Sequence, residues 1–198
     1  MRLGAKVLAT AALLGLLGTA GGASTLSALN DTTANPGNSF VSGTVEIADD
    51  DAGTAVASFS NGRPGTTTTG CVNVTYTGTL PSTVRLYGTT TGTGLDAYLD
   101  LKITRGKITQ TPAAGSCTTF TADSTDYGNG GAGIVYNGLL SGLGSTAATG
   151  IADPRASAPT TWGAGDVRAY KVQVTLRNEA SGQGKNATTS FSWVAENT

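Results

Sequence analysis

The chain of 198 residues contains no histidine, and this absence excludes several classes of enzyme. Zincin-type peptidases bind their metal through two histidines one helical turn apart. Serine triads and cysteine–histidine pairs also need an imidazole as the base. What is left is a serine–lysine dyad or a carboxylate pair for glycoside hydrolysis, and no spacing in the sequence favours either. We therefore expect a protein that is not an enzyme and that carries no cofactor.

Charged residues are also scarce. They make up 13% of the chain, with 12 basic and 13 acidic residues and a formal net charge of −1. No basic stripe is present, so a nucleic-acid partner is not expected. The polar surface must therefore come from threonine, serine, asparagine and the 29 glycines, a composition typical of short strands and many turns.

Long hydrophobic runs are absent apart from one near the start. Val7–Ala20 is apolar, follows Arg2 and Lys6, and is shorter than the roughly 20 residues that span a bilayer as a helix. Small residues come next, as a signal peptidase requires. We expect residues 1–27 to be a cleaved signal peptide and 28–198 to be one secreted domain without a stable membrane anchor. The alternative is an uncleaved anchor or a buried helix, which the flanking glycines disfavour.

Only two cysteines, Cys71 and Cys117, are present. In an exported chain an even number of cysteines predicts a disulfide. The bond would close a long loop, for which the chain-entropy model gives a stabilisation of about 3–4 kcal/mol. The alternative is two free thiols or a metal pair, and a zinc site would have to recruit carboxylates because histidine is absent.

Apolar and polar residues alternate with a period of two along the rest of the chain, and helical periodicity is nearly absent. One apolar and one polar face per strand predicts antiparallel sheets that bury one face, and two such sheets make a sandwich. We therefore predict an all-β fold, an antiparallel β-sandwich in one domain. The predicted strands are 41–48, 55–59, 71–78, 83–88, 97–106, 134–136, 169–178 and 187–196.

Two connections are expected to be short and hairpin-like. The "LPS" turn at 80–82 joins two predicted strands, and the glycine-rich loop 179–186 suits an antiparallel hairpin between the last two. A helical turn is expected around Leu139–Leu143.

The acidic run Asp49, Asp50 and Asp51 is a weak calcium candidate. Adjacent residues of a strand point to opposite sides, and the spacing does not match an EF-hand loop. A solvated turn between two strands is the simpler interpretation, so we predict no metal site. Three arginines share no obvious face and are expected to be surface charges: Arg105, Arg155 and Arg168.

Aromatic residues divide into two groups. Five lie on apolar faces and are expected in the core: Phe40, Phe59, Tyr76, Phe191 and Trp193. Four tyrosines would supply a sugar-stacking surface for a carbohydrate-binding or surface-binding module, although nothing clusters them in sequence: Tyr87, Tyr98, Tyr127 and Tyr136.

The start of the chain carries a family resemblance. "GGASTLSALNDTTANPGNSFVSGTVEIADDDAG", at 21–53, is similar to the SipW-dependent signal peptide and mature start of TasA and camelysin-like proteins. It shares a glycine pair before the cut, an Ala-aromatic/aliphatic-Asn-Asp start, a small-polar spacer and the pattern F-x-x-G-T-x-x-I/L. Leu29 departs from the phenylalanine that the family often has at this position. "CVNVTYTGTLPSTVRLYG", at 71–88, resembles the family's next strand pair. The residues that carry the first match are Gly21, Gly22, Ala28, Leu29, Asn30, Asp31, Phe40, Gly43, Thr44, Val45 and Ile47.

The resemblance implies cleavage between Ser27 and Ala28 by a SipW-type signal peptidase, and a jelly-roll-like sandwich. It also implies a structural role outside the cell, in a biofilm matrix or on the cell surface. Camelysin supplies an alternative, a surface metallopeptidase.

In fibre-forming members of the family, the mature N-terminus adds a strand to the next subunit. Physically this is β-augmentation, and a head-to-tail contact of this kind propagates into a filament. The partner expected here is a second copy of the chain, and the donor lies in a flexible arm at 28–39. An arm without a partner is the alternative. The donor-strand candidate consists of Ala28, Leu29, Asn30, Asp31, Thr32, Thr33, Ala34 and Asn35.

Overall fold

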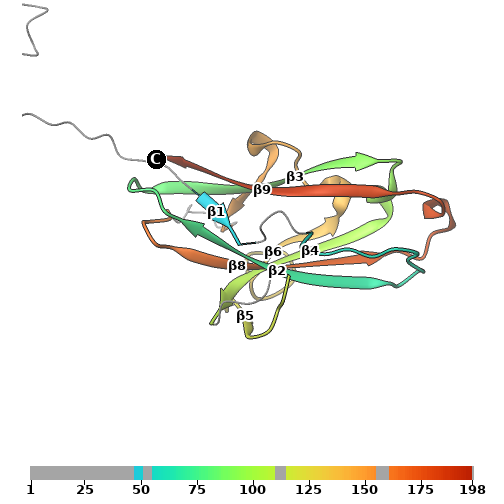
Figure 1. Cartoon of the computed structure of the whole chain (residues 1–198), viewed down its shortest axis with the longest axis horizontal. Coiled ribbons are helices and arrows are strands. Elements are labelled where there is room, and N and C mark those ends of the chain that lie inside the picture. The colour runs from blue at the N-terminus through green and yellow to red at the C-terminus, as the bar shows by residue number, and fades with distance from the viewer. Residues whose placement is uncertain (1–46, 51–54, 110–114, 155–160, 198) are drawn as a thin grey trace, which may run out of the picture. The chain divides into compact units, whose positions relative to one another are not determined.

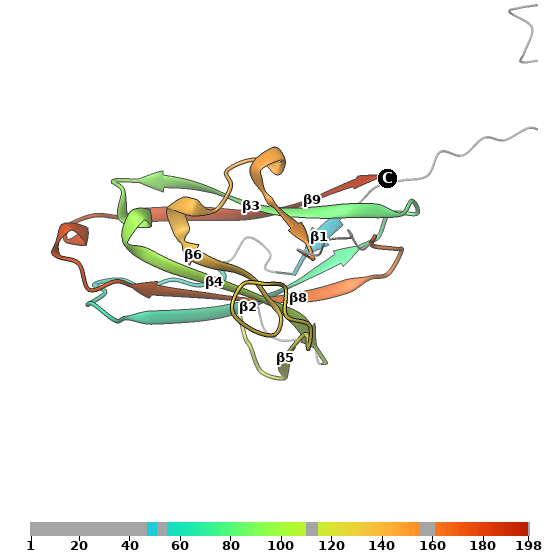
Figure 2. The ribbon, with the colours of Figure 1, turned by 180° about the vertical axis from the view of Figure 1, so that it is seen from behind.

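Two antiparallel sheets lie face to face in the computed structural model, which describes residues 47–50, 55–109, 115–154 and 161–197 (Figure 1). Figure 2 shows the same two layers from behind. The prediction of an all-β antiparallel sandwich is therefore confirmed.

Within the described ranges the larger sheet consists, in spatial order, of β1 (Ile47–Asp49), β2 (Thr67–Tyr76), β8 (Val167–Leu176) and β4 (Leu99–Ile108). Two further strands, β5 (Phe120–Ala122) and β6 (Ile134–Leu139), both pair with β4. The smaller sheet consists of β7 (Ile151–Asp153), β3 (Ser82–Gly92) and β9 (Ala187–Asn197).

The long strands form because their side chains alternate between the core and the surface. In β3, Val84 and Leu86 are buried, whereas Arg85 and Tyr87 between them are partly exposed. A shift of the register by one residue would move every apolar side chain of the strand to the solvent face. The hydrophobic pattern therefore fixes both the strands and their pairing.

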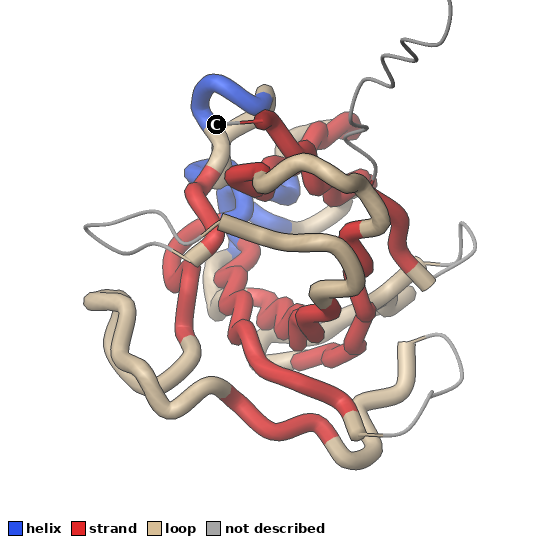
Figure 3. The backbone as a smooth tube through the Cα atoms, turned by 90° about the vertical axis from the view of Figure 1, so that its left-hand side faces the viewer, coloured by secondary structure: helices blue, strands red, loops and turns tan. Residues whose placement is uncertain are grey.

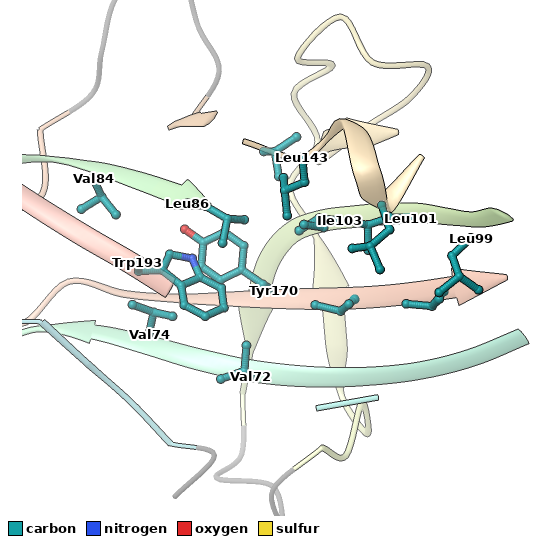
Figure 4. Packing of buried hydrophobic residues seen from close by; sticks show 14 of the residues in the cluster. Val72, Val74, Val84, Leu86, Leu99, Leu101, Ile103, Leu143, Tyr170 and Trp193 are labelled. Atoms are coloured by element: carbon teal, nitrogen blue, oxygen red, sulfur yellow. The ribbon is translucent and has the colours of Figure 1, made fainter. Parts of the chain in front are cut away.

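The core lies between the two sheets (Figure 4). Trp193 of β9 packs on Tyr170 of β8, with ring centroids 5.1 Å apart, and this contact joins the smaller sheet to the larger one. Figure 3 turns the molecule by 90° and shows the backbone of the strands from one end of the sandwich. The largest fully buried side chains are Trp162, Tyr76, Tyr170, Leu86, Leu101 and Ile103.

Both predicted hairpins are wrong. β2 and β8 belong to the larger sheet, whereas β3 and β9, which follow them in the chain, belong to the smaller sheet. The connections therefore cross from one layer to the other. In the first, the buried Tyr76 hydroxyl donates to the carbonyl of Leu80 and lies 2.7 Å from the Ser82 hydroxyl, which holds the chain in a turn out of the plane of the sheet.

Short 3-10 helices occupy several connections in the described residues. The expected helical turn near Leu139 is one of them, η2 (Leu140–Gly142). The others are η1 (Leu95–Tyr98), η3 (Ala147–Thr149) and η4 (Ala180–Gly182). None of the helices in these ranges is long and apolar enough to cross a membrane.

The predicted disulfide joins Cys71 of β2 to Cys117. The predicted strand at 55–59 does not form, although Val56 and Phe59 still pack against the core. The predicted signal peptide at 1–27, the predicted arm at 28–39 and Phe40 lie outside the described residues.

Candidate functional site

The outer edge of β9 is unpaired within the described residues. β9 pairs with β3 along its whole length, and no strand of these ranges pairs on its other side. In β3, the backbone of Ser82 bonds to Trp162 and the amide of Gly88 bonds to Gly144, both on the side away from β9. Backbone groups alternate between the two sides of a strand. The odd-numbered residues of β3 must therefore make the bonds to β9.

This alternation determines which amides of β9 face outward. Ser190 and Ser192 stand opposite Thr89 and Tyr87 and so form the ladder bonds with β3. The amides of the odd-numbered residues between and beside them, such as Thr189, then point toward the open edge. An extended segment placed beside β9 would find a row of donors and acceptors at strand spacing.

A groove of about 940 Å³ opens beside the first half of this edge, between the two sheets. Its apolar lining comes from the segment 55–64 and from β4, β8, η2 and β9, and includes Phe59, Leu99, Leu140, Val174 and Phe191. An added strand would therefore have backbone partners on one side and an apolar surface for alternate side chains. This pairing of an open edge with a groove is the arrangement that β-augmentation uses.

The rim of the groove carries more positive than negative charge. Arg63, Arg177 and Lys185 line it together with Glu179. Arg177 is paired with Glu179, at 3.2 Å, whereas Lys185 lies over the ring of Tyr98 and donates to a backbone carbonyl. Neither Lys185 nor Arg63 has a carboxylate partner among the described residues. An acidic side chain on a bound segment would pair with this rim. Because the charges are exposed, such an ion pair would add up to about 1 kcal/mol to the binding free energy.

The groove and the point where the chain enters the sandwich lie at opposite ends of the strands. Thr68, near the start of β2, lines the groove, whereas Ile47 pairs with Tyr76, the last residue of β2. Figure 1 accordingly shows β1 beside the C-terminal end of β9, away from the start of β9.

A second polar feature is a buried ion cluster that ties the sheets together. Arg105 of β4 is 7% exposed and Asp153 of β7 is 4% exposed. The Arg105 Nε lies 3.1 Å from Asp153 Oδ2, and its Nη1 pairs with Asp123. The Trp162 Nε1 donates to the same Asp153 oxygen at 3.2 Å, and the Tyr127 hydroxyl donates to Asp123 at 2.9 Å. The expectation that Arg105 is a surface charge is therefore wrong.

Burial and charge act in opposite directions within this cluster. Burial raises the pKa of Asp153, and Arg105 only partly offsets it. Burial is the largest single effect on the pKa of Arg105 and lowers it, but Asp153, Tyr170 and Asp123 together raise this pKa more, so the guanidinium stays charged. Burial and the neighbouring Asp153 both raise the pKa of Tyr170. Arg105 belongs to the larger sheet and Asp153 to the smaller one, so the ion pair between them joins the two layers.

The acidic run has a structural use. Asp50 accepts from the backbone amide of Asn73 at 2.8 Å and from its side-chain amide at 2.9 Å, so both carboxylate oxygens have donors. Asp49 ends β1, and Asp51 lies outside the described residues. In the part of the chain that the structure describes, no three acidic, cysteine or histidine side chains lie close enough to hold a metal ion.

The four tyrosines proposed for sugar stacking do not share one element. Tyr87 is on β3, Tyr98 in η1 and Tyr136 on β6, and Tyr127 belongs to the ion cluster. Of the other two arginines, Arg168 is half-buried and pairs with Asp166, while Arg155 lies outside the described residues.

Together the fold and the site define a class, a β-sandwich protein whose smaller sheet has, among the described residues, an unpaired edge with an apolar groove beside it. Comparison with known proteins does not narrow this class. The chain matches no protein-family model, and no curated protein gives a significant match.

Proposed function

We propose that this chain is a secreted, non-enzymatic structural protein of the cell surface or biofilm matrix, and that it assembles by adding a strand of one copy to the next. The proposal includes removal of residues 1–27 by a SipW-type signal peptidase, as in the TasA and camelysin-like proteins that the start of the chain resembles. The observation that carries it is the edge of β9 to which no strand of the described residues pairs, beside a groove with an apolar lining.

The donor in this proposal is the segment Ala28–Asn35 of a neighbouring copy. Its large apolar residue, Leu29, would enter the groove, and its acidic residue, Asp31, two residues further along on the same side of the extended segment, would meet the positive rim. Pro36 and Gly37 follow as a hinge that lets the donor leave its own domain. Because the groove lies at the end of the strands opposite Ile47, each copy offers a donor at one end and an acceptor at the other. Such a heterologous contact need not close into a ring, so it extends into a filament.

Deleting residues 28–35 from the chain that begins at Ala28 should abolish filaments seen by electron microscopy, because the donor is removed. Two single substitutions are matched for charge: Leu29→Asp should reduce assembly at least tenfold, since it places a carboxylate in the apolar groove. Thr32→Asp adds the same charge on the opposite side of the extended segment and should leave assembly nearly unchanged. Filaments that persist in the deletion variant would rule out this donor.

A further inference from the structure

The outer edge of β2 lies on the same side of the sandwich as the open edge of β9, since Ile47, Val74 and Trp193 line one small cavity between them. The amide of Tyr76 donates to Asp166, and the carbonyl of Thr66 accepts from Leu176, both toward β8. By alternation, the backbone of the odd-numbered residues of β2 faces away from β8 and toward this edge.

Unlike β9, this edge has partners at three successive residues whose backbone faces outward, Thr75, Asn73 and Cys71. Ala48 of β1 pairs with Thr75. Asp50 bonds to the backbone of Asn73 in two ways. Its carboxylate accepts from the Asn73 amide, and its own amide donates to the Asn73 carbonyl.

The third position is Cys71, whose amide donates to the carbonyl of Gly115 at 3.2 Å. Gly115 is held beside β2 by the bond between Cys71 and Cys117, two residues further along the chain. No other backbone hydrogen bond of the described residues joins Gly115–Cys117 to β2. Cys71 itself is 1% exposed, so the disulfide ties the segment to a buried position of β2, whereas the next attachment along the chain is β5, which begins at Phe120 and pairs with β4 at the other edge of the sheet.

We propose that the Cys71–Cys117 disulfide keeps the outer edge of β2 covered, so that strands are added to β9 alone. A single hydrogen bond at Gly115 is too weak to hold a loop in place against its conformational entropy, whereas a covalent bond holds it permanently. Without the disulfide the amide of Cys71 loses its partner at Gly115, and it adjoins Thr69, whose amide also faces outward. The carbonyl of Val56 packs against Gly70 between them but accepts no backbone hydrogen bond from β2 among the described residues. Two copies then pair edge to edge through β2. The inference rests on the proposed function only in naming β9 as the edge that remains for assembly.

Amide hydrogen exchange tests directly whether the outer edge of β2 is covered at Cys71. It is measured on the chain that begins at Ala28, once with the disulfide intact and once after a phosphine has reduced it. The protection of the Cys71 amide should fall at least tenfold on reduction. Val72 and Val74 face β8 and should keep their protection. Unchanged protection at Cys71 would show that the segment stays in place by itself. Loss at all three amides would show that the disulfide stabilises the whole fold rather than this edge, and would equally overturn the proposal.

Association is measured by sedimentation on the chain without residues 28–35, which lie outside the compact unit 43–198 and include the proposed donor. With Cys71→Ala and Cys117→Ala this protein should form dimers or larger species, whereas the disulfide-bonded parent stays monomeric. Adding Thr69→Pro should restore the monomer, because proline blocks the edge without removing a bond to β8. A monomeric double-alanine protein, or dimers that persist with Thr69→Pro, would overturn the proposal. Since no donor is present, these outcomes are independent of whether residues 28–35 drive filament growth.

Discussion

Replacing Arg105 by alanine should lower the free energy of unfolding by about 3–5 kcal/mol. The substitution removes the positive charge from a buried cluster and leaves Asp153, at 4% exposure, with only the Trp162 indole as a hydrogen-bond donor of ordinary geometry among the described residues. An uncompensated carboxylate in a low-dielectric interior is costly, and the alanine also loses the link between β4 and β7. Urea denaturation of the disulfide-bonded chain measures the change.

Two variants make this prediction specific. Arg168→Ala removes an arginine that is half-exposed and paired with Asp166 at 3.4 Å, and it should cost about 1 kcal/mol or less. Arg105→Ala combined with Asp153→Leu removes both charges of the inter-sheet pair and should recover part of the lost stability. A loss for Arg105→Ala no larger than that for Arg168→Ala would contradict the view that the cluster joins the sheets.

The sequence contains a signal for Arg105 that the prediction of a surface charge overlooked. Leu99, Leu101 and Ile103 alternate along β4 toward the core, and Arg105 is the next residue on the same face. A charge in an inward position needs a partner. The partner, Asp153, lies 48 residues further along the chain, and no local pattern indicates a contact at that distance.

The strands themselves were predictable because their alternation is local, but their arrangement was not. The apolar faces of β2, β8 and β9 are visible in sequence, and the disulfide follows from the number of cysteines. Whether a short loop makes a hairpin or crosses between layers depends on which sheet the next strand joins. The buried hydroxyl of Tyr76 stabilises the connection from β2 to β3, but the sequence indicates only that Tyr76 is an aromatic residue on an apolar face. Likewise, which strand edge stays unpaired among the described residues depends on all the other pairings, so sequence alone did not single out β9.

The acceptor side of the proposed assembly can be tested at Thr189 of β9. Its amide points toward the open edge, and its side chain lines the groove. Thr189→Pro removes the donor that an added strand would use, worth about 1 kcal/mol, and places the proline ring in the path of that strand. Proline is tolerated at such an edge because no bond to β3 is lost. We expect the filament mass measured by sedimentation to fall at least tenfold, which corresponds to about 1.4 kcal/mol in the contact.

Thr189→Val is the matched control for this prediction. Threonine and valine have nearly the same shape, and valine keeps the backbone amide while losing the hydroxyl that lies 2.8 Å from the Thr90 hydroxyl. If the edge amide matters, Thr189→Val assembles like the parent and only Thr189→Pro fails, with both variants folded by circular dichroism. Equal loss in both variants would assign the effect to the Thr90 contact instead. Normal assembly of Thr189→Pro, in a chain that still requires residues 28–35, would mean that the donor is received on another strand, because a proline in the middle of the acceptor edge is incompatible with a continuous ladder.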